Sequence, residues 1–285
     1  MSAAAGPLRD RGPDRDPDRE VSRGRDRGRD LGAAEVPAWV RGIVDGAPRA
    51  AQALAGLSRA SAGRPGRSEG RRAAVLVCLS PGAASTARGA GDRGGEHPGD
   101  VLVLERAAGL RAHAGQPALP GGAVDPSDAG EVEAALREAH EETGLDVRGV
   151  EVLATMPVLR VPPEGFAVTP VIAWELSPSR VLPGAPEEVV RVLRVPLAEL
   201  VDPSRRVVVT WDRRLPGPGG TDGLRVRGEG PGFEVGGLLV WGFTAALLSA
   251  LLEAGGLERP WGGARRVPAP APPGTAGRPP GQVTA

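Results

Sequence analysis

The stretch Leu119-Pro120-Gly121-Gly122, followed by Arg137-Glu138-Ala139-His140-Glu141-Glu142-Thr143-Gly144-Leu145, decides the fold of this chain because it joins a glycine turn to an acidic helix. At about 100° per residue, Glu138, Glu141 and Glu142 share one side of that helix. Three close carboxylates repel one another unless a cation lies among them, and their hard oxygen atoms suit Mg²⁺ or Mn²⁺. The pattern predicts a divalent-metal site for pyrophosphate chemistry; the alternative is a solvated acidic stripe.

The same helix carries an apolar side. Ala134, Ala135, Leu136 and Ala139 would pack on a sheet while the carboxylates face a cleft. Gly144 predicts where the helix ends, because glycine readily adopts the left-handed conformation that closes a helix.

The segment Arg137–Leu145 resembles the second half of the Nudix hydrolase box, Arg-Glu-apolar-x-Glu-Glu-x-Gly-apolar. The resemblance implies that Glu138, Glu141 and Glu142 hold the metal. Arg137 is then expected to pair with a neighbouring carboxylate and fix the helix face. Which glutamate acts as general base stays open; Glu141 and Arg137 are the predicted catalytic residues.

The upstream half of the box departs from the family. The glutamate that the family places before the helix falls on Ala129, and Asp128 and Glu131 are the nearest carboxylates. Glu131 lies seven residues before Glu138 and so on nearly the same face, which makes it the better stand-in.

A second stretch looks like the signature of the coenzyme A pyrophosphatase branch of Nudix. Its parts are Leu102–Ala107, Arg111, Gly115 and Leu119–Gly122, with leucines where that branch usually has Thr (Leu104) and Phe (Leu119). Weaker similarities lie in Asp125–Ala129, Val168–Val171 and Val240–Ala245.

This resemblance gives Arg106 and Arg111 a role, since guanidinium groups bind phosphate oxygens through paired, charge-assisted hydrogen bonds. Gly121 and Gly122 complete the predicted substrate-binding set, and a carbonyl of their turn is expected to join the metal. The alternative is that both arginines are ordinary exposed residues, because all 35 basic residues of the chain are arginine.

The predicted reaction is metal-assisted hydrolysis of a diphosphate linkage, with a metal lowering the pKa of the attacking water. Coenzyme A or acyl-CoA would yield 4′-phosphopantetheine and adenosine 3′,5′-bisphosphate. Two alternatives stay open: another nucleotide substrate, such as a nucleoside triphosphate, ADP-ribose or NADH, and a Nudix-fold binding module without turnover, which the residue at Ala129 keeps in play.

Composition divides the chain into four parts. Residues 1–35 alternate arginine and aspartate with almost no large apolar residue, and 259–285 are rich in proline and glycine, so both are expected to be disordered. Residues 36–71 are read as a short helix and linker at the domain's edge. Residues 72–258 are read as the Nudix domain.

Apolar runs predict the sheet of this domain: 75–79, 101–104, 150–159, 166–176, 189–195 and 207–211. A mixed sheet flanked by helices follows, an α/β/α sandwich of the kind that the resemblance implies.

Val235–Leu252 contains no charged residue, which raises a membrane span as an alternative to a core helix beginning near Leu238. The absence of flanking basic clusters and aromatic belts favours the core helix. The formal net charge of zero argues against a nucleic-acid partner. Cys78, the one cysteine, is read as a core residue. We expect the protein to be cytoplasmic and to act on a small nucleotide substrate. Whether it forms a homodimer stays open.

Overall fold

The computed structural model describes residues 36–61, 70–82, 99–110, 114–161, 165–214, 225–262 and 265–270. The expected disorder of residues 1–35 and of the last residues of the chain falls outside this range, as does the predicted substrate residue Arg111.

The described residues form a mixed sheet of eight strands. Its central strands β1 (Arg71–Ser80) and β7 (Phe166–Glu175) are parallel to each other, and the other pairings are antiparallel. The remaining strands are β2 (Asp100–Arg106), β3 (Pro117–Ala118), β4 (Gly121–Ala123), β5 (Val150–Thr155), β6 (Leu159–Val161) and β8 (Val189–Pro196). β1 reads as a continuous apolar run because both of its faces are covered.

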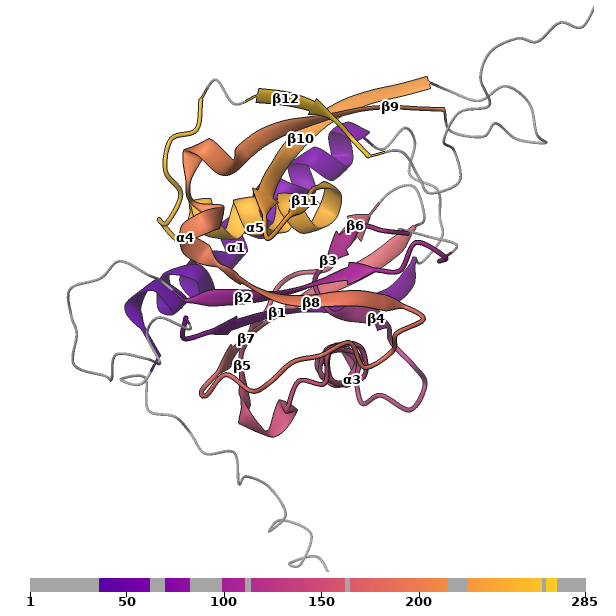
Figure 1. Ribbon diagram of the computed structural model, residues 1–285, viewed down its shortest axis with the longest axis vertical. Coiled ribbons are helices and arrows are strands. Elements are labelled where there is room, and N and C mark those ends of the chain that lie inside the picture. Colours follow the sequence, from indigo (N-terminus) through magenta and orange to yellow (C-terminus); the bar gives the residue numbers. More distant parts are fainter. Residues whose placement is uncertain are drawn as a thin grey trace, which may run out of the picture. The chain divides into compact units, whose positions relative to one another are not determined.

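Helices cover the two faces of this sheet (Figure 1). The acidic helix α3 (Glu131–Thr143) packs on one face, where its alanines meet Ala74, Leu76 and Cys78 of β1. The helices α1 (Ala38–Ser61) and α5 (Gly242–Ala254) lie on the other face, in a second core with Val77 and Leu79. The short α4 (Leu197–Leu200) and the 3₁₀ turns η2 (Val147–Gly149) and η3 (Pro203–Arg205) join the strands. The predicted α/β/α arrangement with a mixed sheet is confirmed.

A second sheet lies beyond α1 and α5 (Figure 1). It was not predicted as a separate sheet, and the expected strand 207–211 belongs to it rather than to the eight-stranded sheet. Its order is β11-β10-β9-β12, with β9 (Arg206–Arg214), β10 (Arg225–Val235), β11 (Leu238–Val240) and β12 (Arg265–Pro268). β12 runs parallel to β9, from the pair Arg265–Val207 to the pair Pro268–Thr210. The expectation that the chain is disordered from residue 259 on is therefore wrong for this stretch, because pairing with β9 satisfies its backbone.

The helix α1 corrects a further expectation. It was placed at the domain's edge, but one side of it is buried. The buried side chains on this side include Val40, Ile43, Ala47, Ala50 and Leu54. A side chain at Gly46 would lie 2.5 Å from the carbonyl oxygen of Ala254 at the end of α5. The missing side chain lets the two helices touch, so α1 belongs to the core of the same compact unit as the sheets.

Two smaller differences concern element boundaries. The expected strand 150–159 is divided into β5 and β6, both paired with β7. Leu238–Val240 is strand β11 rather than the start of a helix, and α5 begins at Gly242. Within the described residues, no helix combines the length and the apolar character needed to cross a bilayer.

Candidate active site

The helix α3 is fixed at both ends. Near its start, Oε2 of Glu133 accepts a hydrogen bond of 2.5 Å from the backbone N–H of Ala129. At its end, Gly144 takes the left-handed conformation (φ 65°), and its N–H donates to the His140 carbonyl at 2.8 Å. The buried alanines between these ends bring the helix close to β1, and with it the acidic residues.

Glu142 lies where the helix meets the glycine turn. Its side chain is almost completely buried, with 3% of the residue exposed. Its Oε2 accepts a hydrogen bond from the Gly121 N–H at 2.9 Å, and its Oε1 lies 3.2 Å from Nη1 of Arg106. Burial raises the pKa of Glu142 to about 7, although the Gly121 hydrogen bond and the Arg106 charge act in the opposite direction.

Glu138 lies one turn earlier, against Gly122. A Cβ atom at Gly122 would be 2.5 Å from the carboxyl carbon of Glu138, so only glycine leaves room for this carboxylate. Burial raises the pKa of Glu138, and the charge of Glu141 adds to the effect. The charge of Glu138 also raises the pKa of Glu142. The ionised form of Glu142 is thus disfavoured by burial and by the charge of its neighbour.

Glu141 points elsewhere. Its side chain is 55% exposed, and its Oε2 lies 3.1 Å from Nη1 of Arg137. The structure therefore brings Glu138 and Glu142 together at the glycine turn but leaves Glu141 at the rim. Accordingly, the described part of the chain holds no group of three or more His, Cys, Asp or Glu side chains arranged to bind a metal ion.

Arg137 pairs with carboxylates on two sides, as the sequence suggested. Its guanidinium forms a fork with Asp128, with Nε to Oδ1 and Nη2 to Oδ2 both at 3.0 Å. Its Nη1 lies 3.0 Å from Oε1 of Glu138. The hydrogen bond to Asp128 is the main cause of its raised pKa. Arg137 thus ties the segment before the helix to the carboxylates on it.

Glu131, the expected replacement for the missing upstream glutamate, has a different partner. Its Oε1 accepts hydrogen bonds from Nε of Arg72 at 3.0 Å and from Nη2 at 2.7 Å. This contact lies at the start of β1, whereas Asp128 is the upstream carboxylate that is linked through Arg137 to Glu138. The sequence argument favoured Glu131 because it used only the positions of residues around the helix, and not the link from Asp128 through Arg137.

Arg106 reaches Glu142 from the end of β2. The pairing of β2 with β8 shifts its register between Glu105 and Arg106, and such a bulge re-aims the side chain that follows it. The neighbouring Glu105 is held by Nε of Arg191 at 2.6 Å. Of the two arginines predicted to bind phosphate, Arg106 lies within the described residues and Arg111 does not.

The loop between β7 and β8, which no sequence pattern predicted, packs on the end of α3. The N–H of Leu182 donates to the Thr143 carbonyl at 2.9 Å, and the N–H of Gly184 donates to the Glu142 carbonyl at 3.0 Å. A side chain at Gly184 would lie 2.0 Å from the Glu141 carbonyl oxygen. Glu188 follows in this loop, and its charge contributes to the raised pKa of Glu142.

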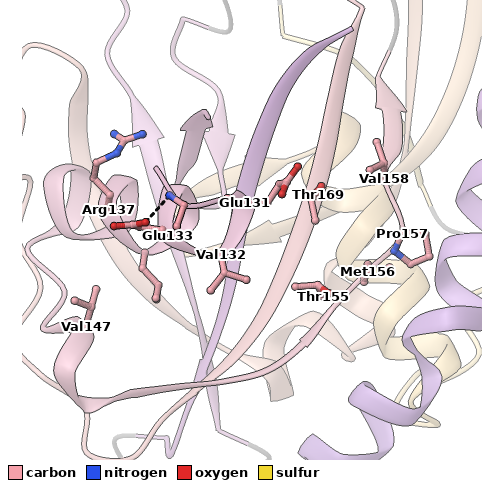
Figure 2. Close-up of a pocket in the computed structure, with 13 residues that line it drawn as sticks. Glu131, Val132, Glu133, Arg137, Val147, Thr155, Met156, Pro157, Val158 and Thr169 are labelled. Atoms are coloured by element: carbon pink, nitrogen blue, oxygen red, sulfur yellow. Dashed lines mark hydrogen bonds between the residues drawn. The ribbon is translucent and has the colours of Figure 1, made fainter. Parts of the chain in front are cut away.

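A groove of about 880 Å³ runs beside the first half of α3. Figure 2 shows Val132 of the helix facing Thr155 and Met156, with Glu131, Glu133 and Arg137 also on its border. Its walls are mainly apolar. Glu138 and Glu142 are not among the residues that line the groove, but Arg137 on its border contacts Glu138, so the groove adjoins the carboxylate pair.

The residues present fit a hard divalent cation. Two carboxylates whose pKa values are raised mainly by burial lie next to a glycine turn, and Mg²⁺ is commonly held by one or two carboxylates with water and phosphate completing its shell. A cation would relieve the electrostatic cost of burying Glu142 in its ionised form.

Fold and site together define a class: a mixed-sheet α/β protein whose acidic helix meets a glycine turn beside an arginine. The NUDIX domain family model matches residues 90–214. NudL of Pectobacterium atrosepticum, an uncharacterized Nudix hydrolase, is 36% identical over 156 residues, which are 54% of this chain and 75% of that protein. The chain belongs to the Nudix hydrolase family.

Other relatives match shorter stretches. An uncharacterized NudL of Enterobacter sp. is 43% identical over 119 residues, 42% of this chain and 60% of that protein. NudL of Citrobacter koseri is 45% identical over 99 residues, 35% of this chain and 50% of that protein. The chain thus spans 50 to 60% of the length of these two relatives. The crystal structure of RenU, a Nudix hydrolase from M. smegmatis, is 26% identical with a TM-score of 0.35, over 46% of this chain and 73% of that one.

Proposed function

We propose that this protein hydrolyses a diphosphate linkage with the help of a divalent cation. The observation that carries the proposal is the environment of Glu142, a buried carboxylate fixed by the Gly121 N–H and facing Arg106. An ionised carboxylate so deeply buried is costly unless positive charge compensates it. A bound cation and the guanidinium of Arg106 would both compensate the charge of Glu142, and both can also bind the oxygen atoms of a diphosphate.

Each residue of the site then has a defined task. Glu138 and Glu142 would hold the cation, together with a carbonyl of the Gly121–Gly122 turn. The cation, when bound, supplies charge neutralisation and a water molecule of lowered pKa. Arg106 would bind phosphate oxygens of the substrate.

Glu141 is the proposed carboxylate for proton transfer, since it lies on the same helix and reaches solvent. Arg137 positions Glu138 and Glu141 rather than touching substrate, because its contacts run to carboxylates of the protein. Water adds to one phosphorus as the bond between that phosphorus and the bridging oxygen breaks, and the bridging oxygen leaves with the other phosphate.

Coenzyme A or acyl-CoA is the proposed substrate, cleaved to 4′-phosphopantetheine and adenosine 3′,5′-bisphosphate. The support is the segment Leu102–Ala107 with its spacing to Leu119–Gly122, which resembles the coenzyme A pyrophosphatase signature. Arg106 belongs to this segment, and its side chain contacts Glu142. The other nucleotide substrates are outcomes that the same experiment separates.

The test is product analysis by mass-resolved chromatography with Mg²⁺ or Mn²⁺ and, in separate reactions, coenzyme A, ADP-ribose, NADH and nucleoside triphosphates. We expect adenosine 3′,5′-bisphosphate from coenzyme A. The variant Glu142→Gln should lose turnover, whereas Glu133→Gln should keep it, because Glu133 serves only the start of the same helix. Turnover of a different substrate would retain the metal site and reject coenzyme A.

A binding module without turnover is the second candidate. It is favoured by Ala129 in the upstream position and by the exposure of Glu141, which leaves two carboxylates at the turn. Tight binding of a nucleotide without any product would support it.

A further inference from the structure

Arg106 and Glu142 form an ion pair at the border between the core and solvent. The Arg106 side chain is 23% exposed, whereas that of Glu142 is 4% exposed, and Nη1 lies 3.2 Å from Oε1. A partly exposed guanidinium therefore lies against Oε1 of a carboxylate that is almost completely buried.

The two oxygens of Glu142 have partners of different kinds. Oε2 is bound by the neutral backbone N–H of Gly121, which is fixed in β4. The partner of Oε1 is the Arg106 side chain, which has several rotatable bonds and can turn while its backbone stays in place. A cation approaching Glu142 would meet the positive charge of Arg106 at Oε1.

The backbone of Arg106 is well anchored, so any rearrangement is confined to its side chain. Its N–H donates to the Gln116 carbonyl at 3.1 Å, and its own carbonyl accepts from the Gly115 N–H at 3.1 Å. The next residue is held as well, since the N–H of Ala107 donates to the Glu188 carbonyl at 2.7 Å.

We propose that Arg106 is the exchangeable partner of Glu142: in the free protein it occupies Oε1, and when a divalent cation takes that oxygen, Arg106 turns to the diphosphate of the substrate. This inference rests on the proposed function, because it needs both the cation and the diphosphate. Arg106 is then a positioning residue for the cation and a binding residue for the substrate.

The exchange has a thermodynamic consequence. Without substrate, Arg106 and the cation compete for one carboxylate, so the ion pair weakens cation binding. With diphosphate bound, the arginine has a better partner and the competition ends. Cation and substrate must therefore strengthen each other's binding by the same factor.

The experiment uses the full chain at pH 8 and measures Mn²⁺ binding by titration calorimetry without any phosphate compound. Arg106→Gln should bind Mn²⁺ about 5-fold to 100-fold more tightly than the parent protein, the range of typical coupling between two sites. Arg191→Gln is the matched control, because it removes a neighbouring arginine that pairs with Glu105 instead. Its Mn²⁺ affinity should equal that of the parent.

A second titration uses a coenzyme A analogue in which a methylene group replaces the bridging oxygen of the diphosphate. At saturating Mn²⁺, Arg106→Gln should bind this analogue at least about 10-fold more weakly, since a charge-assisted bond to phosphate is lost. Arg106→Lys keeps the charge and should retain a Mn²⁺ affinity near that of the parent. If the glutamine variant does not fold, Arg106→Met, which also removes the charge, replaces it in both titrations.

The outcomes separate two failures. If the parent protein binds no Mn²⁺ and Glu142→Gln changes nothing, the proposed metal site itself is wrong. If the parent binds Mn²⁺ and loses it in Glu142→Gln, but Arg106→Gln binds Mn²⁺ no more tightly than the parent, the site stands and the exchange is overturned.

Discussion

The backbone N–H of Gly121 donates a hydrogen bond of 2.9 Å to Oε2 of Glu142, and this contact joins the glycine turn to the acidic helix. Gly121 has a φ of 154° and lies so close to β1 that a Cβ atom would be 2.3 Å from the Ala74 carbonyl oxygen. A side chain at position 121 would therefore push β4 away from β1 and the N–H away from Glu142.

Gly121→Ala is expected to lower the free energy of unfolding by about 1–3 kcal/mol, from backbone strain and the displaced strand. Urea denaturation followed by circular dichroism measures this. Gly109→Ala is the control, because a Cβ there would meet nothing within 4 Å. Equal stability of the two variants would refute the tight contact between β4 and β1.

Gly122→Ala should act differently, because its added carbon would meet the end of a flexible side chain rather than backbone. It would lie 2.5 Å from the carboxyl carbon of Glu138, which can rotate away. We expect a small loss of stability but at least about 10-fold weaker Mn²⁺ binding, as a displaced ligand would cause. Gly149→Ala, in open surroundings, should leave Mn²⁺ affinity unchanged.

The raised pKa of Glu142 predicts a dependence of stability on pH. Burial raises the pKa of this carboxyl group from its ordinary value of 4.5, expected in the unfolded chain, to about 7 in the folded one. Its contribution to stability is therefore fully present below pH 4.5 and is lost as the pH rises through about 7, by about 3 kcal/mol in total. A cation that pairs with the ionised form should offset the loss.

Thermal melts at pH 5 and pH 8, with and without Mn²⁺, measure this effect. The rise in Tm caused by Mn²⁺ should be larger at pH 8 than at pH 5. In Glu142→Gln, both the loss of stability between these pH values and the Mn²⁺ effect should shrink. An equal Mn²⁺ effect at both pH values would contradict a cation bound to Glu142.

Arg137→Ala should weaken the site without removing a proposed ligand. The arginine forks onto Asp128 and also contacts Glu138 and Glu141, so its loss leaves three carboxylates without their shared counter-charge. We expect kcat to fall by about 10-fold to 100-fold. Arg148→Ala, which removes an exposed arginine that pairs with Asp146, should leave kcat unchanged.

Local patterns predicted the longer strands of the first sheet and the acidic helix, because apolar runs and a C-terminal glycine depend on nearby residues. They did not predict the short strands β3 and β4. They failed where distant residues decide. β10 contains Gly228, which a strand pattern disfavours, but a side chain there would lie 2.6 Å from the indole of Trp211 on β9. The glycine makes room for a partner that only the folded sheet brings close.

The acidic helix shows a similar limit at finer scale. A helical projection puts Glu138, Glu141 and Glu142 on one side, but that side is wide. The pair Glu138 and Glu142, four residues apart, faces the glycine turn, while Glu141 is rotated toward solvent and meets Arg137. Which members of an acidic face converge depends on the turn opposite, and spacing along the helix does not contain that information.

Arg206 contacts Glu258 and Trp261, at the start of the stretch from residue 259 on that composition suggested to be disordered. Its guanidinium is buried between the rings of Phe233 and Trp261, at 4.4 and 4.3 Å from their centroids, and Nη2 lies 2.8 Å from Oε1 of Glu258. Stacking and ion pairing together compensate its burial, which by itself lowers the pKa of Arg206.

Arg206→Ala is expected to lower the free energy of unfolding by about 3–5 kcal/mol, because it removes the cation that pairs with Glu258 and stacks on two rings. Arg206→Lys keeps the charge but cannot stack as a planar group, so its loss should be intermediate. Arg205→Ala, at a neighbouring and more exposed position, is the control and should change stability by less than about 1 kcal/mol. Hydrogen exchange should show faster exchange in Arg265–Pro268 for Arg206→Ala, since the segment that leads into β12 loses its attachment at Trp261. Unchanged protection of β12 in that variant would mean that its pairing with β9 alone holds the C-terminal segment in place.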